Sequence, residues 1–270
     1  MFDRHELASE NLYLEQIYSD LHTIISNALA EAEKSGKKLL VIAGEQHSSL
    51  YSFLLQVLLL LVVKDHGIKN LIVEFPEKFV NSILSSPRPV KTLNTEFSIP
   101  FARRKLKMSI IPADLDYIQL NPSNENKDGV REEEMIRCCH EKIKDHALFI
   151  AGSNHVKPLS EQLKAVFHVV PINISKITVL ETIEFNCIRA LNFINPKILD
   201  YGPSDLGERY DFIKNSKEVI QIEYPVNLDY LCHQKIISSI RKWHETLHKP
   251  FLFKQLSESS ALRCSSHGII

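Results

Sequence analysis

The sequence has almost no net charge and no long apolar run, and each absence excludes a class of protein. The formal net charge of the 270 residues is -1 at pH 7, so the chain has no overall field that would attract nucleic acid or an anionic membrane. The longest apolar run, residues 54–63, is interrupted by Gln56 and is half as long as a membrane span. We therefore expect no nucleic-acid partner and no membrane span.

The sequence also lacks a cysteine framework and a signal peptide. Its five cysteines are an odd number, and Cys138 and Cys139 are adjacent within a helical pattern, unlike the spacing in disulfide scaffolds or zinc knuckles. Residues 1–12 are charged and polar, without the apolar core of a signal peptide. We expect a reducing environment, with the protein either cytoplasmic or secreted without a classical signal peptide.

What is present is the composition of a soluble globular protein, with 44% apolar and 24% charged residues. A chain of 270 residues can bury a core without disulfide or metal staples. Its alternating strand-like and helical segments predict an α/β fold with a mainly parallel sheet flanked by helices and a less regular C-terminal third. Residues 1–175 should form this core, and residues 176–270 should complete the same domain or form a small subdomain. The oligomeric state stays open.

The spacing of apolar residues locates the expected elements. Apolar positions three or four apart predict helices, and short runs rich in β-branched residues predict buried strands. Three prolines, Pro87, Pro89 and Pro100, predict that residues 87–100 form a loop or a lid over the carboxyl rim of the sheet. We expect helices at residues 11–34, 49–65, 77–84, 130–144, 156–166 and 228–247, strands at 38–43, 70–74, 107–111, 147–151, 168–174 and 218–224, a loop at 121–129, an insertion or subdomain at 175–217 and a fraying tail at 256–270.

Polar residues follow each of the first four predicted strands. Ligands of parallel sheets sit beyond the carboxyl ends of the strands, so we expect these residues on one rim, with Glu74 beside Glu45 and His47. Two copies of a Gly-x-x-His motif favour either an internal duplication or one site built from two equivalent loops. The residues concerned are Gly44, Glu45 and His47, then Glu74, then Asp114 and Asp116, and finally Gly152 and His155.

These residue types suit the activation of water. A water held between His47 and Glu74 can lose its proton to either, while His155 donates a proton to the leaving group or stabilises an oxyanion. If a divalent ion is bound, Glu45, His47, Glu74 and His155 are mixed ligands suited to zinc or manganese. Arg131 lies in a first helical turn, where the helix dipole disfavours cations, so we expect a carboxylate partner. The structural alternative makes the histidines turn residues and the acids helix caps.

The order of these motifs resembles the superfamily that joins the erythromycin esterase-like hydrolases, the ChaN-like haem-associated lipoproteins and the TIKI/TraB proteases. The shared features over residues 38–167 are a first Gly-x-x-His, a strand-end Glu, an Arg-x-x-x-Met helix and a second Gly-x-x-His. The resemblance implies that His47 and His155 are the motif histidines, that Glu45 and Glu74 are acidic site residues, and that Arg131 is the helix arginine.

The same resemblance implies hydrolysis of an ester, lactone or amide in a small-molecule or peptide substrate by an activated water. The need for a metal stays open, because the TIKI branch is metal-dependent and the esterase branch need not be. The sequence departs from the pattern at Val156, Lys157 and Pro158, where a glycine often follows the second histidine, and it has no lipobox. The alternative is a catalytically degenerate, effector-like scaffold that binds haem or a protein partner.

Overall fold

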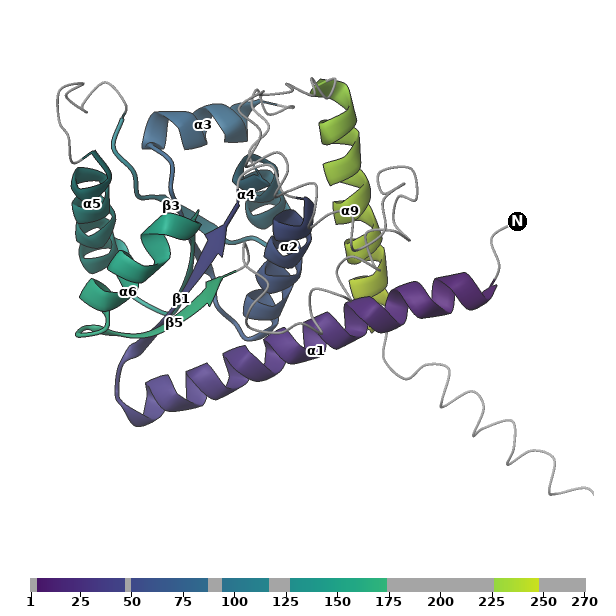
Figure 1. The fold of residues 1–270 in the computed structure, drawn as a ribbon, viewed down its shortest axis with the longest axis horizontal. Coiled ribbons are helices and arrows are strands. Elements are labelled where there is room, and N and C mark those ends of the chain that lie inside the picture. The colour runs from purple at the N-terminus through teal and green to yellow at the C-terminus, as the bar shows by residue number, and fades with distance from the viewer. Residues whose placement is uncertain (1–3, 47–49, 87–93, 117–126, 174–225, 248–270) are drawn as a thin grey trace, which may run out of the picture.

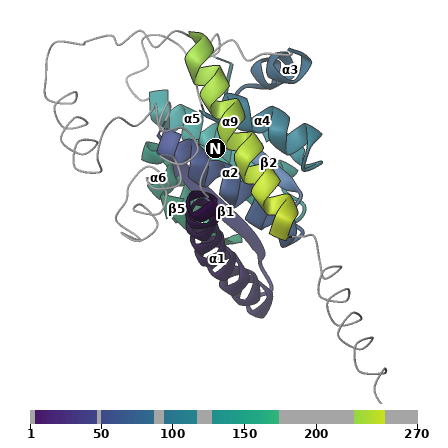
Figure 2. The same cartoon turned by 90° about the vertical axis from the view of Figure 1, so that its right-hand side faces the viewer.

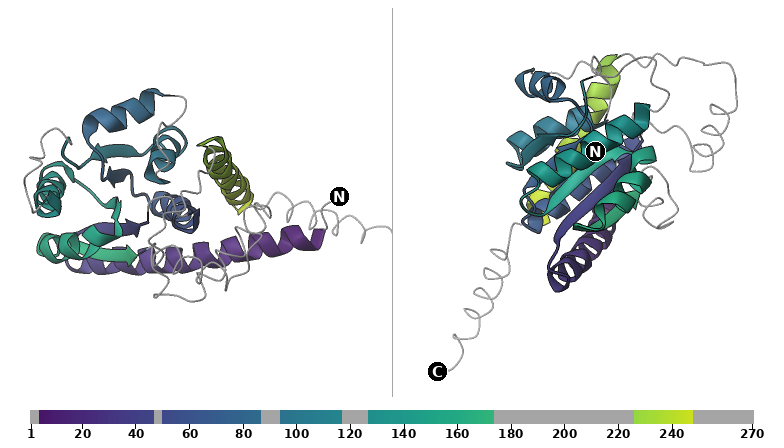
Figure 3. Two further views of the ribbon diagram at one scale, coloured as in Figure 1. Left: turned by 45° about the horizontal axis from the view of Figure 1, so that its top comes forward. Right: turned by 90° about the vertical axis from the view of Figure 1, so that its left-hand side faces the viewer.

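A five-stranded, all-parallel sheet with helices on both faces forms the centre of the molecule (Figures 1 and 3). The structure is a computed structural model, and it describes residues 4–46, 50–86, 94–116, 127–173 and 226–247. In the described residues the strand order is β3-β2-β4-β1-β5, and every pairing is parallel. The α/β prediction is therefore confirmed. The strands are β1 (Lys38–Glu45), β2 (Asn70–Val73), β3 (Ser109–Pro112), β4 (Ala147–Gly152) and β5 (Phe167–Asn173).

Alternate side chains of β1 point into two separate cores, because successive residues of a strand face opposite sides of the sheet. Leu39, Val41 and Ala43 belong to the larger core, and Leu40 and Ile42 to the smaller one. The larger core includes α1 (Arg4–Lys34), α2 (Leu50–Asp65), α3 (Glu77–Ser85), α4 (Asn94–Arg104) and α9 (Val226–Leu247). The smaller core includes α5 (Lys127–Lys142) and α6 (Val156–Leu163), the latter preceded by a 3-10 turn (Ser153–His155).

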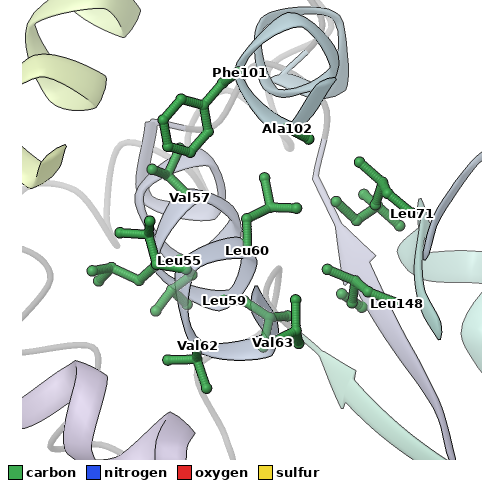
Figure 4. Close-up of a cluster of buried hydrophobic side chains, with 14 of the residues drawn as sticks. Leu55, Val57, Leu59, Leu60, Val62, Val63, Leu71, Phe101, Ala102 and Leu148 are labelled. Carbon is green, nitrogen blue, oxygen red and sulfur yellow. The ribbon is translucent and has the colours of Figure 1, made fainter. Parts of the chain in front are cut away.

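Helix α2 carries apolar side chains on nearly every side, and other elements of the fold cover nearly all of them. Its residues 52–63 are all buried, and the helix packs against α1, α4, α9 and β1. Figure 4 shows its leucine and valine side chains leaving the helix in several directions, toward α4 as well as toward strands β2 and β4. Full burial of each such side chain stabilises the fold by roughly 1.5–3 kcal/mol. The position of α9 alongside α2 and α4 is clearest in Figure 2.

The predicted loop or lid at residues 87–100 is wrong for its last part. Residues 94–104 form α4, a helix with Pro100 inside it. A proline inside a helix removes one hydrogen bond and costs about 3 kcal/mol. Burial of Phe97, Ile99, Phe101 and Ala102 offsets that cost, because these side chains enter the larger core. Tertiary packing therefore stabilises a helix at residues where the prolines had predicted a loop.

Several predicted segments lie outside the described residues. The helix at residues 228–247 is present as α9, whose Ile236, Ile240 and Trp243 are buried in the larger core. Among the described residues, no helix is long and apolar enough to cross a membrane. The segments outside are residues 87–93 of the predicted lid, residues 121–126 of the predicted loop, the insertion at 175–217, the strand at 218–224 and the tail at 256–270. Residues 127–129 begin α5, so the loop predicted at 121–129 is wrong there.

Candidate functional site

Five charged or titratable side chains meet at the carboxyl edge of the sheet, on the face that α5 and α6 cover. We call them the strand-end cluster: Glu74, Asp114, Arg131, Glu132 and His155. Glu74 follows β2 directly, and its side chain lies on the same face as that of Ile72, two residues earlier, which is part of the smaller core. Asp114 follows β3, and His155 ends the turn after β4. The first turns of α5 supply the other two residues.

Arg131 binds two carboxylates at once. Its Nε lies 3.1 Å from Asp114 Oδ1, and its Nη2 lies 2.7 Å from Asp114 Oδ2. The same Nη2 also donates a hydrogen bond to Glu74 Oε1. Burial alone would lower the pKa of Arg131, but its hydrogen bonds and charge interactions with Asp114 and Glu74 outweigh burial and raise the pKa. The guanidinium therefore stays charged and holds both acids in place. A carboxylate partner for Arg131 was expected from the sequence, and the structure contains two.

Backbone donors complete the coordination of the two carboxylates. Gly152 donates its N–H to Glu74 Oε2 over 2.5 Å, and Leu115 donates its N–H to Asp114 Oδ1 over 2.8 Å. The side chains of Glu74 and Asp114 are each only 9% exposed. A guanidinium and a backbone amide together fix the orientation of a carboxylate. The carboxylate of Glu74 is thus held toward the turn that carries His155.

The imidazole of His155 lies between two carboxylates. Its Nδ1 is 2.8 Å from Glu132 Oε1, and its Nε2 is 3.5 Å from Glu74 Oε1. A proton on Nδ1 would be donated to Glu132, which leaves Nε2 to take or give a proton on the side of Glu74. A carboxylate therefore lies at each ring nitrogen, and a carboxylate that fixes one nitrogen can orient the other for proton transfer.

Glu132 was not among the residues predicted from the sequence. Helical periodicity could have identified it, since it lies three residues before Met135 and seven before Cys139, both buried on the face of α5 that meets the sheet. Arg131 shares that face. The two charged residues therefore continue the apolar face of α5 upward to the rim of the sheet.

Glu45 does not join the cluster. Its side chain is on the opposite face of the sheet, where its carboxylate accepts hydrogen bonds from Gln56 Nε2 at 2.9 Å and Thr95 Oγ1 at 2.5 Å. The residue is 3% exposed. The alternation that directs Val41 and Ala43 into the larger core directs Glu45 the same way. Strand β4 also lies between β1 and β2. The expectation that Glu74 lies beside Glu45 is therefore wrong.

The two remaining candidates are apart from the cluster or outside the described residues. Asp116 forms an ion pair with Lys78 at 3.1 Å, so Asp114 is the acid after β3 that joins the cluster. His47 lies outside the described residues. Its predicted role as a motif histidine stays a prediction.

The ligand set predicted for zinc or manganese does not fit the described geometry. Glu45 and Glu74 face opposite sides of the sheet, and both oxygens of Glu74 already accept hydrogen bonds from Arg131 and Gly152. Within the described ranges, no three His, Cys, Asp or Glu side chains are grouped so that they could hold a metal ion.

Gly44 allows the turn that carries His155 to approach β1. A Cβ added to Gly44 would overlap Val156 Cγ2 and lie 3.2 Å from the Ser153 Cα. We expect Gly44→Ala to lower the free energy of unfolding by about 1–3 kcal/mol, as overpacking of a core does. Urea unfolding measures this change. Val156→Ala in the same chain should recover part of the loss, and a Gly44→Ala variant as stable as the wild type would refute the packing explanation.

Comparisons with protein-family models, with curated proteins and with solved structures found no match for this chain. The family resemblance seen in the motifs therefore stays an expectation.

Proposed function

We propose that this chain is a hydrolase that cleaves an ester, lactone or amide with a water activated by His155. The observation that supports the proposal best is the position of the imidazole, with Nδ1 at 2.8 Å from Glu132 and Nε2 toward Glu74. Parallel sheets carry their ligands at this edge. The order of the motifs, which resembles the erythromycin esterase-like and TIKI/TraB hydrolases, points to the same reaction class.

In the proposed reaction His155 first accepts a proton from water and then donates it to the leaving group. Nε2 takes a proton from water as the water oxygen bonds to the substrate carbonyl carbon. The resulting imidazolium returns the proton to the leaving oxygen or nitrogen as its bond to that carbon breaks. Glu132 holds the Nδ1 proton throughout, and Glu74 Oε1 faces the positive charge that develops at Nε2.

Arg131 and Asp114 act in this proposal as positioning residues. The guanidinium binds Glu74 and Asp114 together, so the carboxylate of Glu74 cannot rotate away from the imidazole. Fixed donors of this kind reduce the reorganisation needed when charge develops in a transition state. Loss of either residue should therefore affect turnover through the orientation of Glu74.

A catalytically inactive scaffold that binds haem or a protein partner is the second candidate. One observation favours it: the side chain of His155 is only 7% exposed, and a substrate must reach Nε2. In that case the cluster would only hold α5 against the sheet. The two candidates differ in whether removal of a single carboxylate changes a rate of hydrolysis.

A matched pair of variants on α5 separates the candidates. Glu132 contacts His155, whereas the next residue, Glu133, is exposed. We expect Glu132→Gln to lower kcat/KM on a panel of nitrophenyl esters, lactones and amides at least about tenfold and to shift the pH profile, because the Nδ1 proton loses its carboxylate acceptor.

Glu133→Gln should leave both the rate and the pH profile unchanged. If the wild-type chain hydrolyses no member of the panel, or if Glu132→Gln behaves like Glu133→Gln, the hydrolase proposal is wrong and the binding scaffold is favoured.

A further inference from the structure

A cleft of about 200 Å³ lies between α4 and α9, next to the end of α3, on the face of the sheet opposite the strand-end cluster. Its apolar lining comes from both helices, with Phe97, Pro100 and Phe101 on α4 and Ile237 on α9. Figure 2 shows α9 alongside α4. Phe101 is 5% exposed and Ile237 is 9% exposed, so these side chains form a mostly buried floor.

Three cationic side chains line the same cleft. Arg104 is the last residue of α4, Lys105 follows it, and Arg241 comes from α9. All three residues are exposed. None of the described residues that line the cleft is an aspartate or glutamate. The cleft therefore combines an apolar floor with a positive rim, although the whole chain has a net charge of only -1.

The helix dipole does not explain this convergence of charge. Cations at the carboxyl end of a helix are stabilised by its dipole, which accounts for Arg104. Arg241 lies well inside α9, which ends at Leu247, and so gains nothing comparable from its own helix. It pairs through Nε with Glu245 at 3.4 Å, and its side chain, 46% exposed, lines the cleft. Arg104 donates through Nη2 to the Leu84 carbonyl at 2.7 Å, which holds it at the cleft.

We propose that this cleft binds a small molecule with an anionic head and an apolar body. A carboxylate or phosphate would be held between the two arginines and Lys105, since guanidinium groups favour planar, bidentate contacts with such anions. The apolar body would cover Phe97 and Phe101. The cleft is smaller than the roughly 300–1,000 Å³ of pockets for drug-sized ligands, so the ligand should be about the size of one aromatic ring and its head group.

Four probes test the two parts of the ligand separately. Benzoate and phenyl phosphate carry both an anionic head and a ring, inorganic phosphate carries only the charge, and benzyl alcohol has a ring and no charge. We expect saturable binding of benzoate or phenyl phosphate to the full chain in calorimetric or ligand-observed NMR titrations, weakened by added salt. The probe with the higher affinity shows whether the cleft prefers a carboxylate or a phosphate head group. Inorganic phosphate and benzyl alcohol should bind at least about tenfold more weakly.

Substitutions at exposed positions test whether the probe binds in the cleft. Arg241→Gln and Lys105→Gln should each weaken the better probe at least about fivefold. Arg137→Gln, an exposed arginine on α5, should not change its affinity. The proposal is overturned if neither benzoate nor phenyl phosphate binds the wild type, if benzyl alcohol binds equally well, or if the two cleft variants bind like the wild type. Because the cleft is across the sheet from His155, this outcome is independent of the hydrolase test.

Discussion

His155→Ala is expected to lower kcat/KM for the best substrate of the ester, lactone and amide panel at least about a hundredfold. This is the low end of the contribution of a general base. The substitution removes the imidazole that carries both proton transfers in the proposed reaction, while Glu74 and Glu132 stay in place. Initial rates at saturating and limiting substrate concentrations measure the effect.

His140→Ala is the matched control for this variant. His140 is an exposed histidine on α5, the helix that supplies Arg131 and Glu132 to the cluster. Its removal should leave the rate within about twofold of the wild type, as expected for a surface substitution remote from the reacting atoms. A folded His155→Ala variant that retains the wild-type rate would remove His155 from the mechanism, and with it the proposed function.

Arg131→Met is expected to lower the free energy of unfolding by about 3–5 kcal/mol, the cost of breaking a buried ion pair. The methionine would leave the carboxylates of Glu74 and Asp114, each 9% exposed, without their shared counterion. Chemical denaturation followed by circular dichroism measures the change. Arg131→Lys should recover only part of the stability, because an ammonium group cannot bind both carboxylates with the geometry of a guanidinium.

Arg137→Met provides the comparison on the same helix. Arg137 also binds two acids, Glu134 and Glu141, but its side chain is 54% exposed. Exposed ion pairs contribute about 0–1 kcal/mol, so this variant should unfold close to the wild type. If the two variants lose similar stability, the buried cluster does not stabilise the fold in the way described.

A second test removes the charge of Arg131 and the charges of its two carboxylate partners in one variant. Combining Arg131→Met with Glu74→Gln and Asp114→Asn removes the buried charges along with the counterion. Because an uncompensated buried charge costs more than a neutral polar group, the triple variant should be more stable than Arg131→Met alone. A triple variant less stable than the single one would contradict this electrostatic explanation.

The fold was predictable in segments where the apolar residues follow a single helical or strand pattern. The run that precedes Gly44 predicted a buried parallel strand, and the apolar residues at 49–65 predicted a helix. Both predictions are confirmed, with the helix beginning at Leu50. Strand order was less accessible, since hydrophobic runs buried on both faces carry no signal of which strands are neighbours. For this reason the placement of β4 between β1 and β2 was missed.

The cluster was predictable only in part, for a related reason. A continuous apolar run hides which residues of β1 face α5, so Glu45 was expected beside Glu74 although its side chain lies on the opposite face of the sheet. A carboxylate partner for Arg131 was expected because a first helical turn disfavours cations; the partner is present, but α5 begins at Lys127 and Arg131 lies past its first turn. The contact of Glu132 with His155 joins residues 23 positions apart through the packing of α5 on α6. Contacts of that kind depend on tertiary structure, and no local pattern specifies them.

The most direct measurement of the central claim is a double-mutant cycle in kcat/KM for Glu132→Gln and His155→Ala. If Glu132 acts by orienting His155, the double variant should be no less active than His155→Ala alone, because the two residues work as one unit. Losses that multiply in the double variant, or a His155→Ala chain that turns over like the wild type, would contradict a water-activating His155 at the carboxyl edge of this sheet.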